Sequence, residues 1–369
     1  MTTTIHAPDM IETAKQLRAE IESYSDEGQR LRRMPDGLAR LFREQRIFGM
    51  ARPVEYGGMG ADLITTMRTV EEISIADASA GWCAAIGSGS IGMAGLTGEI
   101  AKQIFKPGTA LAGVGSPSGR AIPVDGGYRV TGRWAYASGC QNSEWIFLGN
   151  IVFDGDKPRT LPSGAPEFRA AIVPTSEIEV IDTWHVFGLR GTGSHDVAVQ
   201  DLFVPEERTA VVSLDGSGGT GEQPAIPMFT LFGLALAPVA LGAARRAIDE
   251  LLALAQGKTP AFAPSKLREK AVAQHEIARA EGMLQGGRSF LYEAVGELVD
   301  CAARRETIDM ELRARIKLAV THAVDCAARA VEIAYRLGGG TANYESSVLQ
   351  RCLRDVNAVT QHFMVSPSN

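Results

Sequence analysis

The segment Gly188-Leu189-Arg190-Gly191-Thr192-Gly193-Ser194 carries a dense set of groups that could contact a ligand. Its glycines let the backbone approach a bound molecule closely, while the guanidinium and the hydroxyls offer hydrogen bonds. The residues from Asp196 to Pro205 then alternate with a one-residue slip, which predicts a strand with a bulge near Gln200 and Asp201. Such a loop often binds a cofactor, but it is equally common at a tight corner of a β-sandwich, so composition alone leaves both interpretations open.

Other residues could also take part in chemistry. His362 has an ordinary pKa near 6.5, so it could accept a phenol or N–H proton or donate one; with only seven residues after it, it could also be a surface or capping histidine. Trp82 could stack on an aromatic substrate or belong to the core. The run Gly338-Gly339-Gly340-Thr341 could present backbone N–H groups to an anion or simply cap a helix. No pair of histidines has metal-ligand spacing, so no metal is expected.

Composition excludes several classes of function. A net charge of −6 gives no electrostatic support for binding nucleic acid or an anionic membrane. The N-terminus shows no secretion signal, and the apolar runs are too short to span a bilayer. The five cysteines form no C-x-x-C pair, which argues for a reducing compartment and against a disulfide or zinc scaffold. We therefore expect a cytoplasmic globular protein.

The elements that must position these residues follow from the period of the apolar positions. The first block is helical in pattern, the second shows short alternating segments broken by Gly, Pro and Asp, and the last returns to long helical periods. We expect a helical domain at 1–109, a β domain at 110–212, a glycine-rich linker at 213–227 and a helical bundle at 228–369. The long helices are expected at 229–256, 267–303 and 312–337.

Several motifs, in this order along nearly the whole chain, resemble the acyl-CoA dehydrogenase superfamily. They are Pro53–Gly60, Gly188-Leu189-Arg190, Phe203-Val204-Pro205 and Leu349–Asp355. The resemblance implies an α+β fold with an N-terminal helical domain, a central antiparallel β-barrel or sandwich and a C-terminal four-helix bundle. It also implies a flavin between the β domain and the bundle, and a homotetramer built as a dimer of dimers.

The base that a dehydrogenase needs is missing at both positions where this superfamily places it. Counting along the matched motifs puts Phe363 at one position and Phe232 at the other, and a phenyl ring cannot accept a proton. An FAD-dependent acyl-CoA dehydrogenase-like desaturase with an unrecognised base therefore stays open as an alternative. A non-catalytic or flavin-storing relative is a third possibility.

The loop Gly188–Ser194, the segment Leu349–Asp355 and His362 resemble the oxygenase components of two-component flavin-dependent monooxygenases. That resemblance implies a reduced flavin, FADH2 or FMNH2, supplied by a separate reductase. It also implies reaction with O2 and transfer of one oxygen atom from a flavin C4a-hydroperoxide to an aromatic or heteroaromatic small molecule. The segment Gln256–Phe262 lacks the motif with which dehydrogenases grip the FAD adenine, so FMN and FAD both remain open.

The same resemblance assigns roles to individual residues. His362 and Ser138 are the expected catalytic residues, with the Ser138 hydroxyl on the flavin N5 and Tyr136 beside the flavin ring. The full set expected to bind the cofactor is Ser116, Tyr136, Ser138, Arg190, Gly339, Gly340 and Thr341. The residues expected to line the substrate pocket are Trp82, Ser88, Met93 and Phe363.

Overall fold

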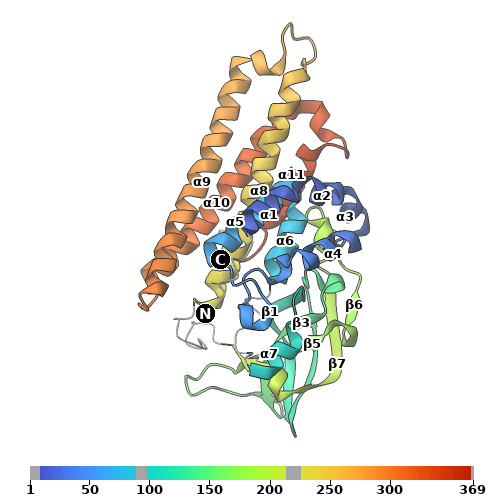
Figure 1. The fold of residues 1–369 in the computed structure, drawn as a ribbon, viewed down its shortest axis with the longest axis vertical. Helices are drawn as coiled ribbons and strands as arrows, with labels where there is room; N and C mark the ends of the chain where they lie inside the picture. Colours follow the sequence, from blue (N-terminus) through green and yellow to red (C-terminus); the bar gives the residue numbers. More distant parts are fainter. Residues whose placement is uncertain (1–8, 89–95, 97, 213–225, 367–369) are drawn as a thin grey trace, which may run out of the picture.

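The chain forms a helical N-terminal part, a β-sheet and a long helical bundle, and the first lies between the other two on one side of the molecule (Figure 1). This computed structural model describes residues 9–88, 96, 98–212 and 226–366. Most of the segment expected to link the sheet to the bundle lies outside these residues, as does Met93.

Three of the N-terminal helices begin at aspartates that accept hydrogen bonds from free backbone N–H groups. Asp9 caps α1, Asp62 caps α5 and Asp77 caps α6. The helix α6 is rich in small residues and almost wholly buried, as its composition suggests. The helices of this part are α1 (Met10–Gln16), α2 (Arg18–Ser23), α3 (Ser25–Leu31), α4 (Asp36–Glu44), α5 (Leu63–Ala76), α6 (Ala78–Gly87) and α7 (Gly98–Ile104).

The central part is one eight-stranded sheet with the order β6-β7-β2-β1-β3-β5-β8, and β4 pairs with β3. Its pairs are antiparallel except β1 with β3, which run parallel because the chain crosses from β2 to β3 through a 3-10 turn, Cys140–Asn142. The strands are β1 (Leu111–Val124), β2 (Gly127–Trp134), β3 (Trp145–Asp154), β4 (Lys157–Pro158), β5 (Phe168–Pro174), β6 (Glu179–Ile181), β7 (Asp196–Pro205) and β8 (Thr209–Val211).

The predicted bulge in the strand from Asp196 to Pro205 is confirmed. The register between β2 and β7 shifts between Val130 and Gly132, opposite Asp201. Asp201 has a φ of 51°, and its backbone N–H donates to the Thr131 hydroxyl at 2.9 Å. The extra residue therefore keeps a hydrogen-bond partner although it leaves the ladder.

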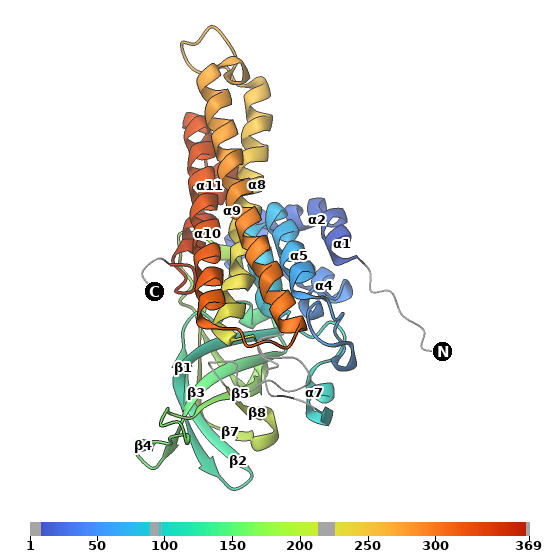
Figure 2. The same cartoon turned by 90° about the vertical axis from the view of Figure 1, so that its left-hand side faces the viewer.

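The C-terminal part is a bundle of α8 (Met228–Gly257), α9 (Ala271–Ala303), α10 (Met310–Gly338) and α11 (Val348–Thr360) (Figure 2). The three long helices match the expected ranges, apart from the start of α9. That helix begins at Ala271 because Leu267–Glu269 forms a separate 3-10 turn and Lys270 is extended. Together with α5 and α6, the bundle encloses the largest apolar core of the molecule.

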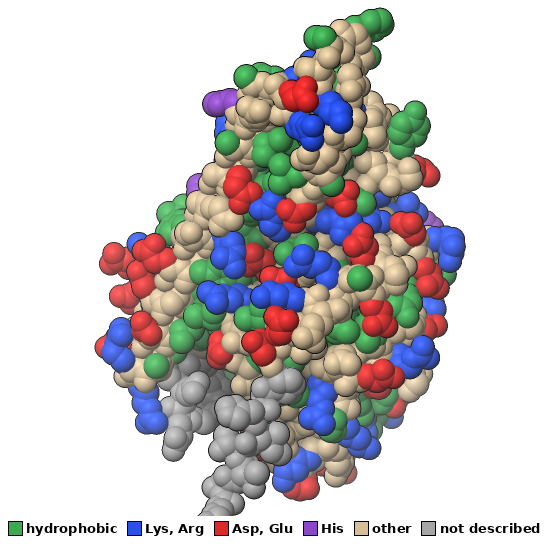
Figure 3. All heavy atoms as spheres, turned by 45° about the horizontal axis from the view of Figure 1, so that its top comes forward, with side chains coloured by type: hydrophobic (Ala, Val, Ile, Leu, Met, Phe, Trp, Pro, Cys, Tyr) green, Lys and Arg blue, Asp and Glu red, His purple; other side chains and the backbone are tan. Residues whose placement is uncertain are grey.

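The surface agrees with the charge argument from composition. Acidic and basic side chains are intermixed on the face in Figure 3, without a large field of either sign. One described helix, Thr230–Gly257 within α8, is long and apolar enough to cross a membrane, with a mean hydropathy of 1.4. Since 72% of its apolar window is buried inside the protein, it has the character of a core helix.

Candidate functional site

The structure brings together Trp82 of α6 and Ser138, which lies in the turn after β2. The indole Nε1 of Trp82 donates to the Ser138 hydroxyl at 3.0 Å, and both side chains are buried. These residues are 56 positions apart in the sequence. Two of the side chains expected at the site, one from the substrate pocket and one from the catalytic pair, are therefore direct neighbours.

His362, which follows α11, completes this cluster from the C-terminal bundle. Its ring lies edge-on to Trp82, with ring centroids 5.7 Å apart, and the ring of Phe363 lies 4.8 Å from it. Phe363 is 47% exposed, so it forms the outer side of the cluster. Three parts of the chain thus supply one group of aromatic rings and a hydroxyl.

The protonation state of His362 follows from its contacts. Its Nδ1 accepts a hydrogen bond from the Met364 backbone N–H at 3.2 Å, so the proton of the neutral ring is on Nε2. Burial first, and the nearby Lys317 ammonium second, lower the pKa of His362 to about 4. His362 is consequently a neutral hydrogen-bond donor near pH 7, which corrects the expectation of a histidine that titrates close to neutrality.

A chain of buried hydroxyls extends from Ser138 into the glycine-rich loop. The hydroxyls of Ser138 and Ser194 are 2.7 Å apart, and those of Ser194 and Thr192 are also 2.7 Å apart. The Thr192 hydroxyl donates to the Leu189 carbonyl at 2.8 Å. The sequence analysis assigned no role to Thr192 or Ser194. The sequence feature that points to them is the alternation of hydroxyl residues with glycine in this loop.

The same loop is held against α11. The Leu189 N–H donates to the Asp355 carboxyl at 2.7 Å, and the Arg354 guanidinium donates to the Phe187 carbonyl at 2.9 Å. A Cβ on Gly188 would lie 2.0 Å from the Arg354 carbonyl oxygen, so only glycine permits this approach. Arg354 and Asp355 therefore both bind the loop.

The buried carboxyl of Asp355 has an unusual environment. Desolvation first, and the Asp77 carboxylate second, raise its pKa to about 7. The hydrogen bond from Leu189 acts in the opposite direction. Asp355 therefore gains or loses its proton near neutral pH, at the junction between the loop and the bundle.

Three other residues expected to bind a flavin, Tyr136, Ser116 and Arg190, have groups available to a ligand. Tyr136 has a φ of 67° and is 71% exposed, with its ring edge-on to Trp184. The Ser116 hydroxyl is exposed on β1, 2.8 Å from that of Ser118. In Arg190 the Nε atom is buried and has no hydrogen-bond partner in the described part of the chain. An exposed ring, exposed hydroxyls and a buried guanidinium Nε without a partner fit a flavin with its aromatic ring and phosphate.

Gly339, Gly340 and Thr341 lie elsewhere in the protomer. They form a 3-10 turn at the end of α10, where the Lys258 ammonium donates to the Thr341 hydroxyl at 2.7 Å. Lys317, beside His362, is on the opposite end of the same helix, about 30 Å away at 1.5 Å per residue. Within one chain, this cluster is therefore not part of the site around Ser138.

Ser88 is also expected to line the substrate pocket, and it lies at the end of α6. Its hydroxyl donates to the Ala85 carbonyl at 2.9 Å, and the side chain is buried. The bond satisfies a carbonyl in the last turn of the helix.

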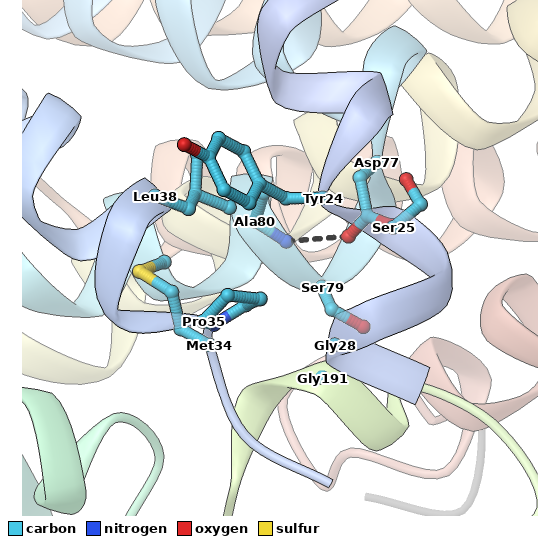
Figure 4. A pocket seen from close by; sticks show the side chains of 10 residues that line it. All are labelled: Tyr24, Ser25, Gly28, Met34, Pro35, Leu38, Asp77, Ser79, Ala80 and Gly191. Carbon is cyan, nitrogen blue, oxygen red and sulfur yellow. Dashed lines mark hydrogen bonds between the residues drawn. The ribbon is translucent and has the colours of Figure 1, made fainter. Parts of the chain in front are cut away.

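A separate hollow lies behind the cluster, between α3, α6 and Gly191 (Figure 4). Its polar groups include the Asp77 carboxylate, which accepts from the Ala80 N–H at 2.8 Å. The hydroxyls of Ser25 and Ser79 are buried there without partners among the described residues. Its free space of about 10 Å³ has room for about one water molecule, so we do not assign it to the flavin or the substrate.

The central cluster is suited to some reactions and not to others. The hydrogen-bond partners of Trp82, Ser138 and His362 in the described part of the chain are hydroxyls, the indole N–H and backbone atoms, and none is a carboxylate. Removing a proton alpha to a thioester requires a carboxylate base beside the reacting carbon. The cluster instead offers aromatic surfaces, hydroxyls and a neutral N–H donor.

Comparisons with known proteins agree with this geometry. Residues 10–102 match the family model for the acyl-CoA dehydrogenase N-terminal domain, and residues 234–367 match the model for its C-terminal domain. The chain is 33% identical to an indole-3-acetate monooxygenase of Pseudomonas putida over 87% of this chain and 81% of the relative. It is 29% identical to the flavin-dependent monooxygenase oxygenase subunit HsaA of Rhodococcus jostii, over 93% and 91% of the two chains.

A solved structure extends the similarity to the whole fold. XiaF from a Streptomyces species, in complex with FADH2 and glycerol, superimposes with a TM-score of 0.88. The sequence identity is 25%, and the match covers 97% of this chain and 91% of XiaF.

Proposed function

Because the chain belongs to the flavin-dependent monooxygenases of the acyl-CoA dehydrogenase superfamily, we propose that it hydroxylates an aromatic or heteroaromatic small molecule. A bound reduced flavin would supply the electrons that activate O2 and the site at which one oxygen atom is passed to the substrate. The observation that carries the proposal is the meeting of Trp82, Ser138 and His362 from three parts of the chain. The two phenylalanines at the expected base positions argue against the desaturase alternative.

The residues of this chain would have distinct tasks. Ser138 holds the hydrogen-bonding edge of the flavin at N5, and Arg190, whose buried Nε has no partner among the described residues, holds its phosphate. The rings of Trp82 and Phe363 bind the substrate ring and keep water from it. His362 donates its Nε2 hydrogen to an acceptor atom of the substrate, because its Nδ1 is engaged by the backbone.

We also propose a cytoplasmic homotetramer that works with a separate flavin reductase. A relative named as an oxygenase subunit supports a separate source of electrons. The five free, buried cysteines fit a reducing compartment. Gly339, Gly340 and Thr341 could contact a flavin only in another copy, since they lie about 30 Å along α10 from Lys317.

The test uses the purified protein loaded anaerobically with reduced FAD or FMN and a panel of aromatic acids that includes indole-3-acetate. After addition of O2, hydroxylated product and H2O2 are both quantified. We expect product from at least one aromatic compound, and a shift from product to H2O2 in Ser138→Ala. The matched control is Ser23→Ala, which removes an exposed hydroxyl far from the cluster.

Reoxidation at the rate of free flavin, with no product from any compound, would contradict the proposal. Tightly bound oxidised FAD that an acyl-CoA reduces would instead support the desaturase alternative. Trp82→Phe refines the test, because it keeps an aromatic ring but removes the N–H that Ser138 accepts. We expect it to lower the fraction of O2 that ends in product several-fold, since a hydrogen bond contributes about 1 kcal/mol.

A further inference from the structure

We propose that Ser194 and Thr192 are positioning residues that orient the Ser138 hydroxyl as a hydrogen-bond acceptor, so that the site prefers reduced over oxidised flavin. This inference rests on the proposed function and on the assignment of Ser138 to the flavin N5. It adds a physical reason why this chain would take up the reduced cofactor and release the oxidised one.

The four side chains form a continuous line of hydrogen bonds with almost no access to water. Their exposed fractions are 1% for Thr192, 4% for Ser194, 5% for Ser138 and 8% for Trp82. The distances along the line are 2.7, 2.7 and 3.0 Å, and its inner end is the Leu189 carbonyl, 2.8 Å from Thr192. Since water has so little access, each hydroxyl must find its partners inside this line.

The direction of the hydrogen bonds follows from counting hydrogens. The Leu189 carbonyl can only accept, so the single hydroxyl hydrogen of Thr192 is used in that bond. Ser194 must then donate to Thr192, and Ser138 must donate to Ser194. The indole N–H of Trp82 occupies one lone pair of Ser138. Ser138 is therefore left with one free lone pair and no free hydrogen, and toward the flavin it can only accept.

The opposite direction is less favourable. If Ser138 donated outward, Ser194 would have to donate to Ser138 and Thr192 to Ser194, and the Thr192 bond to the Leu189 carbonyl would be lost. That carbonyl would keep two donors, the Trp184 indole N–H and the Thr192 backbone N–H, each at 3.1 Å. The line as a whole still loses one buried hydrogen bond, the one that the Thr192 hydroxyl donates.

The two redox states of a flavin differ at the atom that Ser138 faces. Reduced flavin carries a hydrogen on N5 and donates it, whereas N5 of oxidised flavin has only a lone pair and accepts. The favoured direction of the hydroxyl line matches the reduced state, and the oxidised state requires the reversed line. One net hydrogen bond corresponds to a preference of roughly five- to tenfold for reduced flavin.

The experiment measures binding rather than turnover. Dissociation constants for reduced and oxidised FAD are determined anaerobically by equilibrium titration for the wild type, Ser194→Ala, Thr192→Val and Thr192→Ser. In Ser194→Ala, Ser138 loses its inward acceptor, so its hydrogen is free to point toward N5. In Thr192→Val, Ser194 loses its acceptor and turns its hydrogen toward Ser138. Both changes are expected to lower the preference for reduced flavin roughly tenfold.

Two controls separate orientation from damage to the fold. Thr192→Ser keeps the hydroxyl and is expected to retain the wild-type preference. Thr69→Val removes another buried threonine hydroxyl, which donates to the Thr65 carbonyl within α5, and is expected to leave the preference unchanged. Thermal unfolding identifies any variant that has lost its fold.

The outcomes distinguish the two levels of the argument. A wild type that binds neither form of flavin would overturn the proposed function. A wild type that binds flavin, together with folded Ser194→Ala and Thr192→Val variants that keep its preference for the reduced form, would overturn only the orientation by the hydroxyl line. A wild-type preference for oxidised flavin would show that the line runs in the opposite direction.

Discussion

The pH dependence of stability tests the environment of His362. Replacing His362 by Asn keeps an acceptor for the Met364 N–H, because the amide oxygen lies where Nδ1 does, but removes the titrating ring. The wild-type histidine has a pKa of about 4 in the folded protein and near 6.5 in the unfolded chain. Its folded pKa is therefore lowered, and the unfolded state binds more protons between these two values.

The sign and size of the effect follow from this difference. Stability rises with pH where the unfolded state binds more protons, so the wild type loses stability as pH falls from 6.5 toward 4. At about 1.4 kcal/mol per pH unit, the loss attributable to His362 reaches roughly 3 kcal/mol. His362→Asn lacks this loss, so the wild type should become less stable relative to the variant by that amount between pH 7 and pH 4.

The assay is urea denaturation of both proteins at fixed ionic strength across this range, and the measured quantity is the difference between their unfolding free energies. Using the difference removes the contribution of Asp355, whose raised pKa acts with the opposite sign in the same window. A difference that stays constant from pH 7 to pH 4 would refute the reasoning. His362 would then titrate alike in the folded and unfolded chains, and it could serve as a base near neutrality.

Two further predictions concern the junction of the loop with α11. Gly188→Ala should destabilise the protein by about 2–3 kcal/mol in thermal unfolding and weaken flavin binding, because the new Cβ would lie 2.0 Å from the Arg354 carbonyl oxygen. The control is Gly282→Ala in α9, where the new Cβ would have no atom within 4 Å, and it should be neutral or slightly stabilising in the same assay. Asp355→Asn keeps the acceptor for the Leu189 N–H. The pKa of Asp355 is raised from 3.8 in the unfolded chain to about 7 in the folded protein, so wild-type stability falls as pH rises between these values. The unfolding free energy of the variant should therefore increase relative to that of the wild type, by up to roughly 4 kcal/mol by pH 8. A difference between the two unfolding free energies that is the same at pH 5 and pH 8 would contradict this prediction.

Much of the fold could be predicted from local patterns. Helical periods located the three long helices of the bundle, and the slip in alternation located the bulge at Asp201. These features depend on residues within a few positions of one another, so a single sequence carries them. The start of α9 was misplaced because a 3-10 turn and an α-helix share the same apolar spacing over one turn.

The candidate site was predictable only in part. The sequence by itself determined which groups are available: a histidine near the C-terminus, a loop of glycines and hydroxyls, and phenylalanines where a dehydrogenase needs a carboxylate. It also determined, through its motifs, the family to which the chain belongs.

Only the tertiary structure decided how those groups act. In the folded chain, Trp82 and Ser194, each 56 positions from Ser138, both form hydrogen bonds with the Ser138 hydroxyl. Gly339 lies instead at the far end of the bundle. It also turned His362 from a residue that titrates near neutrality into a neutral donor. The physical reason is that hydrogen-bond direction and pKa depend on burial and on partners distant in sequence, and packing alone brings those partners together.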